Sequence, residues 1–572
     1  MAETTLTGLL DRHGREQPQH SALAHIGDLR TGEVAARLDY AGLVTRARSL
    51  AGRLLADGHR PKDRALLLFD TGLEFVVAFF GCAYAGITAV PVPPPGRSRV
   101  ETDRLRGVVR DADATVALTS TALYDEITDG LAGTSIVCHP VDLTVDHFMP
   151  DSLPPVTGGD LALLQYTSGS TSEPKGVMVT HHNLLDNLAR IHDRLGNDVV
   201  PRVCGWLPLT HDMGLIGQLL IPLYLGGECI LVSPTAFLKS PLRWLAAQEE
   251  WNCDIAVAPN FALELCVRRV TTEQAATIDL SRLTRVFTGA EPIRAQTLAG
   301  FAERLAPAGF RADSLLPCYG LAESTLMVAA KDHPGPVVTT AVDQNALAKG
   351  RFEPSPQNGQ VMVASGAFPD SGVRIADPQT GCALPDGEVG EIWVTGASVA
   401  AGYWRNPTAT AETFGARAPE DDRDWLRTGD LGARHEGQLY ITGRRKDVII
   451  IGARNLYPQD LEAVAQSEPG LALVPTVVFG LDDEHIVVVQ ETGSRRGSRE
   501  GLTEAAATIR RNLVRDFGIG APSVVYVKTG RVRRTTSGKV QRALMRRLFV
   551  TDGLEPVYQS LTPGVDRYVK EQ

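Results

Sequence analysis

A loop rich in glycine and hydroxyl side chains, lying between two short apolar segments, is the feature that most constrains this chain. Segments 161–164 and 177–179 each read as a short buried strand. Thr180 then provides an N-cap for a helix that carries Leu184, Leu185 and Leu188. The order of these segments predicts a polar loop held between two strands and followed by a helix.

The loop sequence TSGSTSEPKG (167–176) is suited to holding phosphate groups. Small residues let backbone N–H groups approach phosphate oxygens, hydroxyls add donors, and Lys175 supplies positive charge. It is not a Walker A loop, because Lys175 is followed by glycine rather than by serine or threonine. The alternative is an ordinary surface loop, since clusters of Ser, Gly and Pro commonly connect strands. The candidate phosphate ligands are Thr167, Ser168, Gly169, Ser170, Thr171 and Lys175.

Size and charge limit the possible function classes. A chain of 572 residues is too long for one compact domain and predicts a large domain with a smaller one. The net charge of −10 argues against general nucleic-acid binding. The first residues lack the basic start and apolar core of a signal peptide. Segment 75–90 is apolar but short, so it predicts a core helix and no membrane span.

Eight scattered cysteines include no CxxC pair. They predict buried thiols in a reducing cytoplasm rather than disulfides or zinc ligands.

Strand-like and helix-like segments alternate through the first two-thirds of the chain, which predicts an α/β fold with largely parallel sheets. The expected strands are 64–69, 255–257, 285–288 and 392–394, and the expected helices are 74–85, 242–250 and 295–305. Segment 331–370 lacks a strong periodicity and predicts an exposed insertion. The composition changes after GRRKD (443–447), which predicts a large domain over 1–445 and a small α/β domain over 446–572. The small domain ends in a strongly basic stretch, 528–547.

Eight motifs in order resemble those of the ANL superfamily of adenylate-forming enzymes. They are YTSGSTSEPKG (166–176), LPLTHDMGLIG (207–217), GAEP (289–292), YGLAES (319–324), WLRTGDLG (425–432), GRRKD (443–447), ARNLYPQDLE (453–462) and TTSGKVQR (535–542). Within that superfamily the chain most resembles the fatty acyl-AMP ligases. This narrower resemblance rests on AVPVPPP (89–95), SPTAFLKSPLRWL (233–245), APNFALELC (258–266) and an extra segment within 331–372.

The resemblance implies an enzyme with a large layered α/β domain and a small mobile domain that carries a catalytic lysine. With ATP and Mg²⁺ it would convert a carboxylic acid, of the medium- or long-chain fatty class, to an acyl-adenylate with release of pyrophosphate. The acyl group would then pass to the phosphopantetheine thiol of a separate acyl carrier protein, in lipid or natural-product biosynthesis.

The resemblance also assigns roles around the nucleotide. Glu323 corresponds to a Mg²⁺ ligand, with a helix-cap or salt-bridge glutamate as the alternative. Asp430 would accept both ribose hydroxyls, or could be a turn aspartate. The adenine slot would be formed by Gly289, Ala290, Glu291, Tyr319 and Gly320, and Arg444 would reach the ribose and phosphates; Tyr319 could instead be a core residue.

Lys539 is the candidate catalytic residue, because the matching lysine of the family bridges the carboxylate and the α-phosphate; the alternative is one more exposed lysine in a basic patch. His211 is expected to shape the carboxylate entrance or to be a core histidine. The apolar acyl pocket would be formed by Trp206, Met213, Ile216, Phe261 and Leu263, which could equally be simple core.

One departure concerns Ala453, which stands where most relatives have a glycine on the pantetheine path. It predicts reduced tolerance for the thiol arm. An acyl-CoA ligase, which shares the first step but uses CoA as the acceptor, is an alternative function. So is a catalytically silent adenylate-binding regulatory protein on the same fold, although Lys539, Glu323 and Asp430 argue against it.

Overall fold

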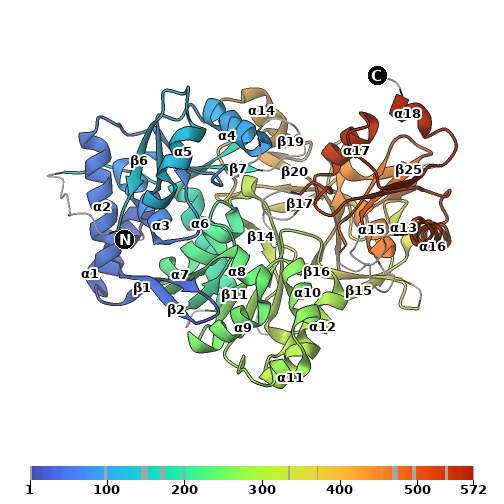
Figure 1. The fold of residues 1–572 in the computed structure, drawn as a ribbon, viewed down its shortest axis with the longest axis horizontal. Helices are drawn as coiled ribbons and strands as arrows, with labels where there is room; N and C mark the ends of the chain where they lie inside the picture. The colour runs from blue at the N-terminus through green and yellow to red at the C-terminus, as the bar shows by residue number, and fades with distance from the viewer. Residues whose placement is uncertain are drawn as a thin grey trace.

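The computed structural model describes residues 3–95, 99–143, 152–167, 174–196, 200–332, 335–357, 359–369, 372–451, 454–466, 474–492, 498–534 and 539–570. Within these residues the strands form five sheets. Two largely parallel sheets and a third, antiparallel sheet make up the large domain, and the C-terminal part lies beside them on the right of Figure 1. The N-terminus lies at the opposite end of the molecule.

A six-stranded sheet carries the predicted phosphate loop. Its order is β6 (Val137–Val141), β5 (Val116–Ser120), β3 (Arg64–Leu68), β4 (Thr88–Pro91), β7 (Leu161–Thr167) and β8 (Lys175–Thr180). Neighbouring strands are parallel except for β7 and β8, which pair antiparallel around the loop. These two strands confirm the predicted pair, and Thr180 caps α6 (His181–Leu195) in a capping box with Asn183.

An eight-stranded sheet lies beside it. Its order is β14 (Met327–Ala330), β13 (Leu315–Gly320), β12 (Arg285–Thr288), β11 (Ile255–Val257), β9 (Arg202–Gly205), β10 (Glu228–Val232), β1 (Ser21–Asp28) and β2 (Glu33–Asp39). The six central strands are parallel. The predicted strands 255–257 and 285–288 are β11 and β12. One buried apolar cluster joins both sheets to α2 (Tyr40–Ala56), α3 (Leu73–Ala85) and α6.

The apolar segment 75–90 is not one helix, which corrects the sequence prediction. Helix α3 ends at Ala85, because Gly86 adopts a left-handed conformation with φ +67°. The chain then enters strand β4. Almost every side chain of α3 is buried, which explains why its sequence is apolar on all sides.

The third sheet is antiparallel, unlike the largely parallel sheets that the sequence predicted. Its order is β15 (Thr339–Val342), β16 (Gln360–Ala367), β21 (Gln438–Arg444), β20 (Asp421–His435), β18 (Gly390–Val394) and β17 (Val373–Ala376), with β19 (Ala416–Ala418) beside β20. Strands β20 and β21 are joined by Glu436 and Gly437, both with positive φ, which is the geometry of a tight hairpin. Short hairpin connections enforce antiparallel pairing.

The prediction of an exposed insertion over 331–370 is partly wrong, because much of this segment is ordered and packed into the third sheet. It contains β15, α13 (Gln344–Leu347) and β16, and β16 is a full member of the third sheet. Val342, Leu347 and Phe352 are buried in a cluster with Tyr440 of β21 and Tyr457 from the C-terminal part. Alternating periodicity was weak because the apolar residues lie in short pieces separated by turns.

The remaining helices of the large domain cover these sheets. They are α1 (Leu6–Glu16), α4 (Arg99–Ala112), α5 (Tyr124–Gly130), the π-helix η2 (Met213–Leu220), α7 (Ile221–Tyr224), α8 (Pro234–Lys239), α9 (Pro241–Glu250), α10 (Asn260–Arg269), α11 (Thr272–Ala275), α12 (Ala295–Leu305) and α14 (Pro407–Phe414). The predicted helices 242–250 and 295–305 are α9 and α12.

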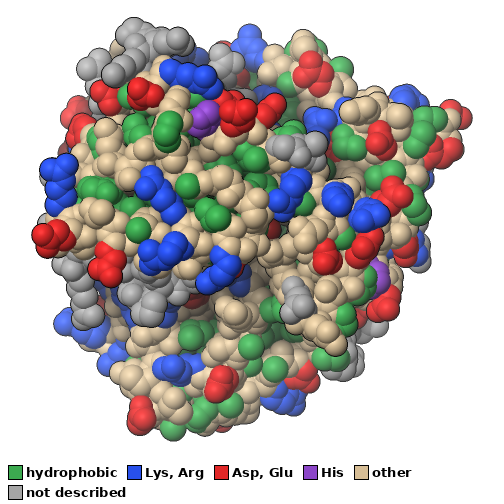
Figure 2. Space-filling model, turned by 90° about the vertical axis from the view of Figure 1, so that its right-hand side faces the viewer, with side chains coloured by type: hydrophobic (Ala, Val, Ile, Leu, Met, Phe, Trp, Pro, Cys, Tyr) green, Lys and Arg blue, Asp and Glu red, His purple; other side chains and the backbone are tan. Residues whose placement is uncertain are grey.

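The C-terminal part is a small α/β unit, as predicted. It contains the hairpin β22 (Ile449–Ile451) and β23 (Arg454–Leu456), the sheet β24 (Thr476–Gly480), β25 (Ile486–Glu491), β26 (Ser523–Val527) and β27 (Tyr558–Ser560), and helices α15 (Pro458–Gln466), α16 (Arg499–Phe517), α17 (Arg542–Val550) and α18 (Asp566–Lys570). Figure 2, which faces this end of the molecule, shows Lys and Arg mixed with Asp and Glu. Among the described residues, no continuous patch of one sign covers this face.

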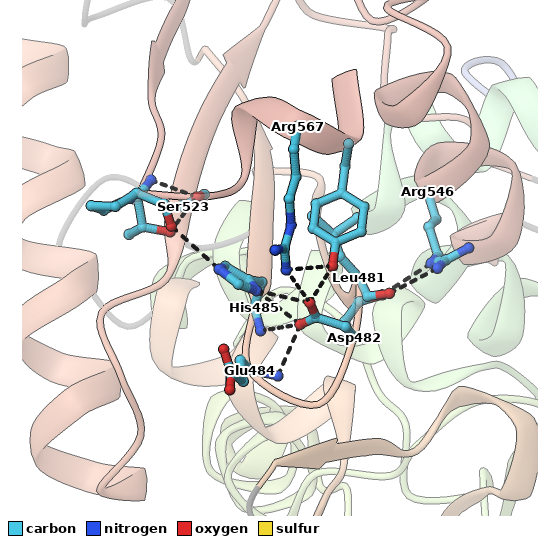
Figure 3. A network of polar contacts seen from close by, with 11 residues as sticks. Leu481, Asp482, Glu484, His485, Ser523, Arg546 and Arg567 are labelled. Carbon is cyan, nitrogen blue, oxygen red and sulfur yellow. Dashed lines mark hydrogen bonds and ion pairs between the residues drawn. The ribbon is translucent and has the colours of Figure 1, made fainter. Parts of the chain in front are cut away.

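A polar network around Asp482 fastens the last helix to this unit (Figure 3). The Asp482 carboxylate accepts hydrogen bonds from the backbone N–H groups of Glu484 and His485 and from the Tyr568 hydroxyl, and it pairs with Arg567. Burial raises the pKa of Asp482, but these donors outweigh burial and hold it well below its usual range. The network ties α18 to the turn between β24 and β25.

No helix among the described residues combines the length and apolarity needed to cross a membrane. All eight cysteines are free thiols; five are buried, Cys138 and Cys318 are half-buried, and Cys382 is exposed. The prediction of buried thiols is thus wrong for Cys382.

Candidate active site

A cavity of about 1780 Å³ opens where the C-terminal part meets the large domain. It is lined by most of the predicted site residues, which come from all parts of the sequence. They are His211, Met213, Phe261, Ala290, Glu291, Tyr319, Gly320, Glu323, Asp430, Arg444 and Lys539. The tertiary structure thus gathers into one space residues that are more than three hundred positions apart in sequence.

One wall of the cavity is built by Tyr319, Asp430 and Arg444. The Tyr319 hydroxyl donates to Asp430 Oδ2 across 2.8 Å, and Arg444 Nε lies 3.2 Å from Oδ1. Asp430 and Arg444 face each other across the β20–β21 pair. Burial raises the pKa of Tyr319, and the Asp430 carboxylate adds to that effect, so the phenol stays a neutral donor.

Glu391 braces the turn that presents Asp430. It is buried, accepts from the Gly429 N–H at 3.2 Å and pairs with Arg427 at 2.7 Å. Sequence reasoning missed Glu391, because a glutamate in a strand carries no motif of its own.

The GAEP turn forms a second wall. Ala290 has φ +67°, a conformation that costs a non-glycine residue energy and is typical of functional sites. The Glu291 carboxylate accepts a hydrogen bond from the Phe261 N–H at 2.5 Å, and this contact caps the start of α10. Burial raises the pKa of Glu291. Gly289 does not line the cavity, but a Cβ there would lie 2.8 Å from the Cys318 carbonyl oxygen. The Gly289 position therefore requires the close approach that glycine permits.

Glu323 lies on the 3₁₀ turn η5 (Ala322–Ser324) and points into the cavity. Thr325, which directly follows this turn, has φ +66° and ψ −63°, and the Leu326 N–H donates to the Ser324 carbonyl at 2.8 Å. These values define a rare and strained γ-turn. The Tyr403 hydroxyl donates to Glu323 Oε1 at 2.8 Å.

A single carboxylate of this kind fits a magnesium ion carried by a nucleotide. Mg²⁺ in nucleotide sites usually takes one or two protein carboxylates and obtains its other ligands from phosphates and water. Among the described residues no group of three His, Cys, Asp or Glu side chains could hold a metal by itself. The residues present therefore suit a nucleotide-bound cation rather than a protein-only metal site.

Lys539 enters the cavity from the C-terminal part. Burial lowers its pKa, whereas the carboxylates of Asp212, Asp430 and Glu291 oppose that shift. Lys539 thus brings a basic side chain into the cavity, where it can contact an anionic ligand.

The side chains of His211 and Asp212 contact each other beside this lysine. His211 Nδ1 lies 2.6 Å from Asp212 Oδ1, and the Met213 N–H donates to the same oxygen at 2.7 Å. Burial raises the pKa of Asp212, but His211 and Lys539 lower it more, to about 2. His211 is about a quarter exposed at its side chain and lines the cavity, so it is not a core histidine. Asp212 lies in the motif LPLTHDMGLIG (207–217), but its local sequence does not indicate a role, because only the fold brings it near Lys539.

The phosphate loop is described only at its two ends. Thr167 pairs with Lys175 across the β7–β8 ladder, and Lys175 Nζ lies 5.0 Å from the centre of the Tyr403 ring. Ser168, Gly169, Ser170 and Thr171 lie outside the described residues, as does Ala453.

The predicted acyl pocket divides into two groups. Met213 and Phe261 line the cavity, whereas Trp206, Ile216 and Leu263 do not. These three are buried in the core. Trp206 stacks on Phe237 with ring centres 4.0 Å apart, so its apolar surface is used inside the protein. The apolar end of the cavity includes Gly217, Val257, Leu265 and Leu326 instead.

Comparison with known proteins gives the family. The sequence pattern of the family described as "AMP-binding enzyme" matches residues 10–404. The medium-chain-fatty-acid–[acyl-carrier-protein] ligase JamA of Moorena producens is 37% identical, over 96% of each chain. The long-chain-fatty-acid–AMP ligase FadD26 of Mycobacterium marinum is 35% identical, over 97% of this chain and 98% of that one.

Solved structures agree with the sequence relatives. The fatty acid AMP ligase from Legionella pneumophila is 33% identical, with 98% of both chains covered and a TM-score of 0.75. A structure from a study of fatty acyl-adenylate ligases from E. coli and L. pneumophila is 32% identical with a TM-score of 0.87, over 95% of this chain and 97% of that one. With its motifs gathered around one cavity and its whole length matched, the chain belongs to the AMP-binding enzymes and, among them, to the fatty acyl-AMP ligases.

Proposed function

We propose that the protein activates a medium- or long-chain fatty acid with ATP and transfers the acyl group to the phosphopantetheine thiol of a separate acyl carrier protein. The observation that carries this proposal is that Lys539, from the C-terminal part, shares one cavity with Glu323 and Asp430. The relatives named above act on fatty acids, and one is named for its transfer to an acyl carrier protein.

In the first step an oxygen of the substrate carboxylate attacks the α-phosphorus of ATP. The bond from that phosphorus to the bridging oxygen breaks, and pyrophosphate leaves. The Lys539 ammonium can contact both the carboxylate and the α-phosphate, where charge builds up in the transition state. Asp430 can accept both ribose hydroxyls, since its oxygens keep lone pairs beyond those used by Tyr319 and Arg444.

Magnesium would shield the charge of the phosphates, with Glu323 as its protein ligand. Thr167, Lys175 and the loop between them would hold the β- and γ-phosphates. Ala290, Glu291, Tyr319 and Gly320 would enclose the adenine, and Gly289 would allow this turn to pack closely against Cys318. Met213 and Phe261 would contact the acyl chain at the apolar end of the cavity.

In the second step the carrier thiol attacks the acyl carbonyl and AMP leaves. Because Lys539 would occupy the side of the site that the thiol has to approach, we propose that residues after the boundary at Lys446 rotate between the two steps. The large domain would span 1–445 and the mobile domain 446–572.

The segment within 331–372 would restrain that rotation and disfavour CoA. It contacts the C-terminal part directly: the Asn455 N–H donates to the Ala348 carbonyl at 2.8 Å, and Gln360 Nε2 donates to Asp460 Oδ1 at 2.7 Å. An acceptor that cannot use the restrained arrangement would be excluded. We place the enzyme in the cytoplasm, where ATP is available and free thiols persist.

The test measures pyrophosphate release with fatty acids of increasing chain length and then follows acyl transfer to a phosphopantetheinylated carrier protein or to CoA. We expect pyrophosphate release with fatty acids and transfer to the carrier. Equal transfer to CoA would support an acyl-CoA ligase instead. Adenylate binding without pyrophosphate release for any acid would support a silent regulatory protein.

A further inference from the structure

Tyr403 contacts two predicted site residues, Glu323 on the turn η5 and Lys175 on strand β8. Its hydroxyl donates to Glu323 Oε1 at 2.8 Å, and its ring faces the Lys175 ammonium at 5.0 Å. The second distance lies within the range of a cation–π contact. Tyr403 is only 7% exposed, yet it lines the cavity together with Glu323, so their hydrogen bond lies at the cavity wall. Lys175 is not among the residues that line the cavity.

The backbone around Tyr403 is fixed to the strand that follows the phosphate loop. The Met178 N–H donates to the Gly402 carbonyl at 2.9 Å, and the Trp404 N–H donates to the Gly176 carbonyl at 2.8 Å. Tyr403 therefore cannot shift without moving β8, the strand that begins with Lys175.

The same segment also holds the turn that carries Glu323. The Ala400 N–H donates to the Glu323 carbonyl at 2.9 Å, and the Thr325 hydroxyl donates to the Ser398 carbonyl at 2.6 Å. Thr325 is the strained residue of the γ-turn, and such strain persists only where the surroundings enforce it. Segment 398–404 thus connects the Glu323 turn to the phosphate-loop strand.

In the contact between Tyr403 and Glu323, the hydroxyl is the donor and the carboxylate is the acceptor. This hydrogen bond occupies Oε1 of Glu323. Oε2 of Glu323 makes no hydrogen bond to the described residues, so it remains available to a ligand in the cavity.

We propose that Tyr403 is a positioning residue that orients the Glu323 carboxylate and the Lys175 ammonium together toward a metal-bound nucleotide triphosphate. The proposal rests on the proposed function, because it names what aligns the metal and phosphate ligands of that site. The Tyr403 hydroxyl contacts Glu323 and its ring contacts Lys175, so its effect should be greatest at the metal–phosphate end of the nucleotide.

The test compares nucleotide binding with and without a metal, in the absence of fatty acid, so that no turnover occurs. Mn²⁺ serves as the probe, and binding of ATP is measured by calorimetry with Mn²⁺ or with EDTA. Tyr403→Phe removes the hydroxyl and keeps the ring. We expect the dissociation constant of Mn²⁺·ATP to rise about 3- to 10-fold, the range for net loss of one hydrogen bond, while the dissociation constant of metal-free ATP changes less than about twofold.

Tyr440→Phe is the matched control, because it removes the hydroxyl of another buried tyrosine, which contacts Thr340 Oγ1 at 2.8 Å and does not line the cavity. It should change neither constant. A second comparison repeats Tyr403→Phe in a Glu323→Gln background, where the metal-specific loss should largely vanish if Tyr403 acts through Glu323.

Equal weakening with and without Mn²⁺, or the full Tyr403 effect in the Glu323→Gln background, would overturn the proposal and assign Tyr403 a purely structural role. These results are separate from the proposed function. A protein that binds Mn²⁺·ATP normally but releases no pyrophosphate with any acid would refute the proposed function while leaving the Tyr403 test readable.

Discussion

The hydroxyl of Tyr319 donates a hydrogen bond to Oδ2 of Asp430 across 2.8 Å, joining strand β13 of the eight-stranded sheet to strand β20 of the antiparallel sheet. The two residues are 111 positions apart in the chain. The bond holds the Asp430 carboxylate at the wall of the cavity, where its oxygens keep lone pairs beyond those used by Tyr319 and Arg444.

This relationship predicts the effect of changing either residue. Asp430→Asn should raise KM for ATP about 10-fold or more, because an amide accepts from a diol less strongly than a carboxylate does. Tyr319→Phe keeps the ring and should raise KM for ATP only about 2- to 5-fold, the effect of one lost hydrogen bond. Steady-state pyrophosphate release at varied ATP measures both. A larger effect for Tyr319→Phe than for Asp430→Asn would contradict the assigned order of importance.

Lys539→Ala should abolish adenylate formation while ATP binding and the fold stay nearly intact. The lysine lies in the cavity but enters from the C-terminal part, so its loss removes a transition-state contact rather than a wall of the nucleotide site. We expect kcat to fall about 100-fold or more with a small change in KM for ATP. Single-turnover pyrophosphate release measures the loss, and a variant that keeps most of its rate would exclude Lys539 as the catalytic residue.

Asp447→Pro tests the proposed rotation. Asp447 ends the short turn η6 (Arg445–Asp447) between the third sheet and the C-terminal part. Proline would fix φ at this position and restrict Lys446 before it. We expect one half-reaction to slow at least about 10-fold more than the other, because each needs a different arrangement of the two domains. Rates of pyrophosphate release and of thioester formation from preformed adenylate provide the comparison, and equal slowing would place the hinge elsewhere.

Asp460 predicts a pH dependence of stability. Burial at the contact with Gln360 raises its pKa from 3.8 to about 7. The folded protein therefore holds a proton that the unfolded chain has released, and the stabilisation this proton gives is complete below pH 3.8 and lost as the pH rises through about 7. Tm should fall between about pH 5 and pH 8, and Asp460→Asn should reduce that fall.

Differential scanning fluorimetry across this range measures the Asp460 effect. The control is Asp552→Asn, which changes an exposed carboxylate and should leave the pH dependence unaltered. An Asp460→Asn variant whose Tm falls as steeply as that of the wild type would show that Asp460 is ionised throughout.

Basic residues near Lys539 predict how a carrier protein docks. Several arginines of the basic stretch are already used: Arg531 pairs with Glu555, Arg542 with Glu462, and Arg546 donates to the Gly480 and Leu481 carbonyls. Arg534 lines the cavity and is unsuitable for a docking test. Arg533 and Arg547 are exposed and remain as candidates.

Replacing Arg533 and Arg547 by Glu should slow loading of an acidic carrier protein about 10-fold at low ionic strength, with a smaller effect in added salt. Pyrophosphate release should be unchanged. Arg15→Glu with Arg243→Glu, on exposed positions of the large domain, gives the same change in net charge and should not slow loading. If both double variants load equally well, the carrier docks on another surface.

The amino-acid sequence by itself determined the elements whose cause is local. The strands and helices around 161–195, 255–257, 285–288 and 295–305 follow from periodicity and capping, which act between near neighbours. Motif order was enough to predict the family and eleven of the residues that line the cavity.

Only the tertiary structure decided which side chains meet. The antiparallel pairing of β15 and β16, the roles open to Asp212, Glu391 and Tyr403, and the core placement of Trp206, Ile216 and Leu263 depend on contacts between distant segments. A buried tyrosine or tryptophan has the same local sequence signal whether it faces a cavity or a neighbouring ring. The difference arises from which sheets pack together, and that is set by the sum of many long-range contacts rather than by any local pattern.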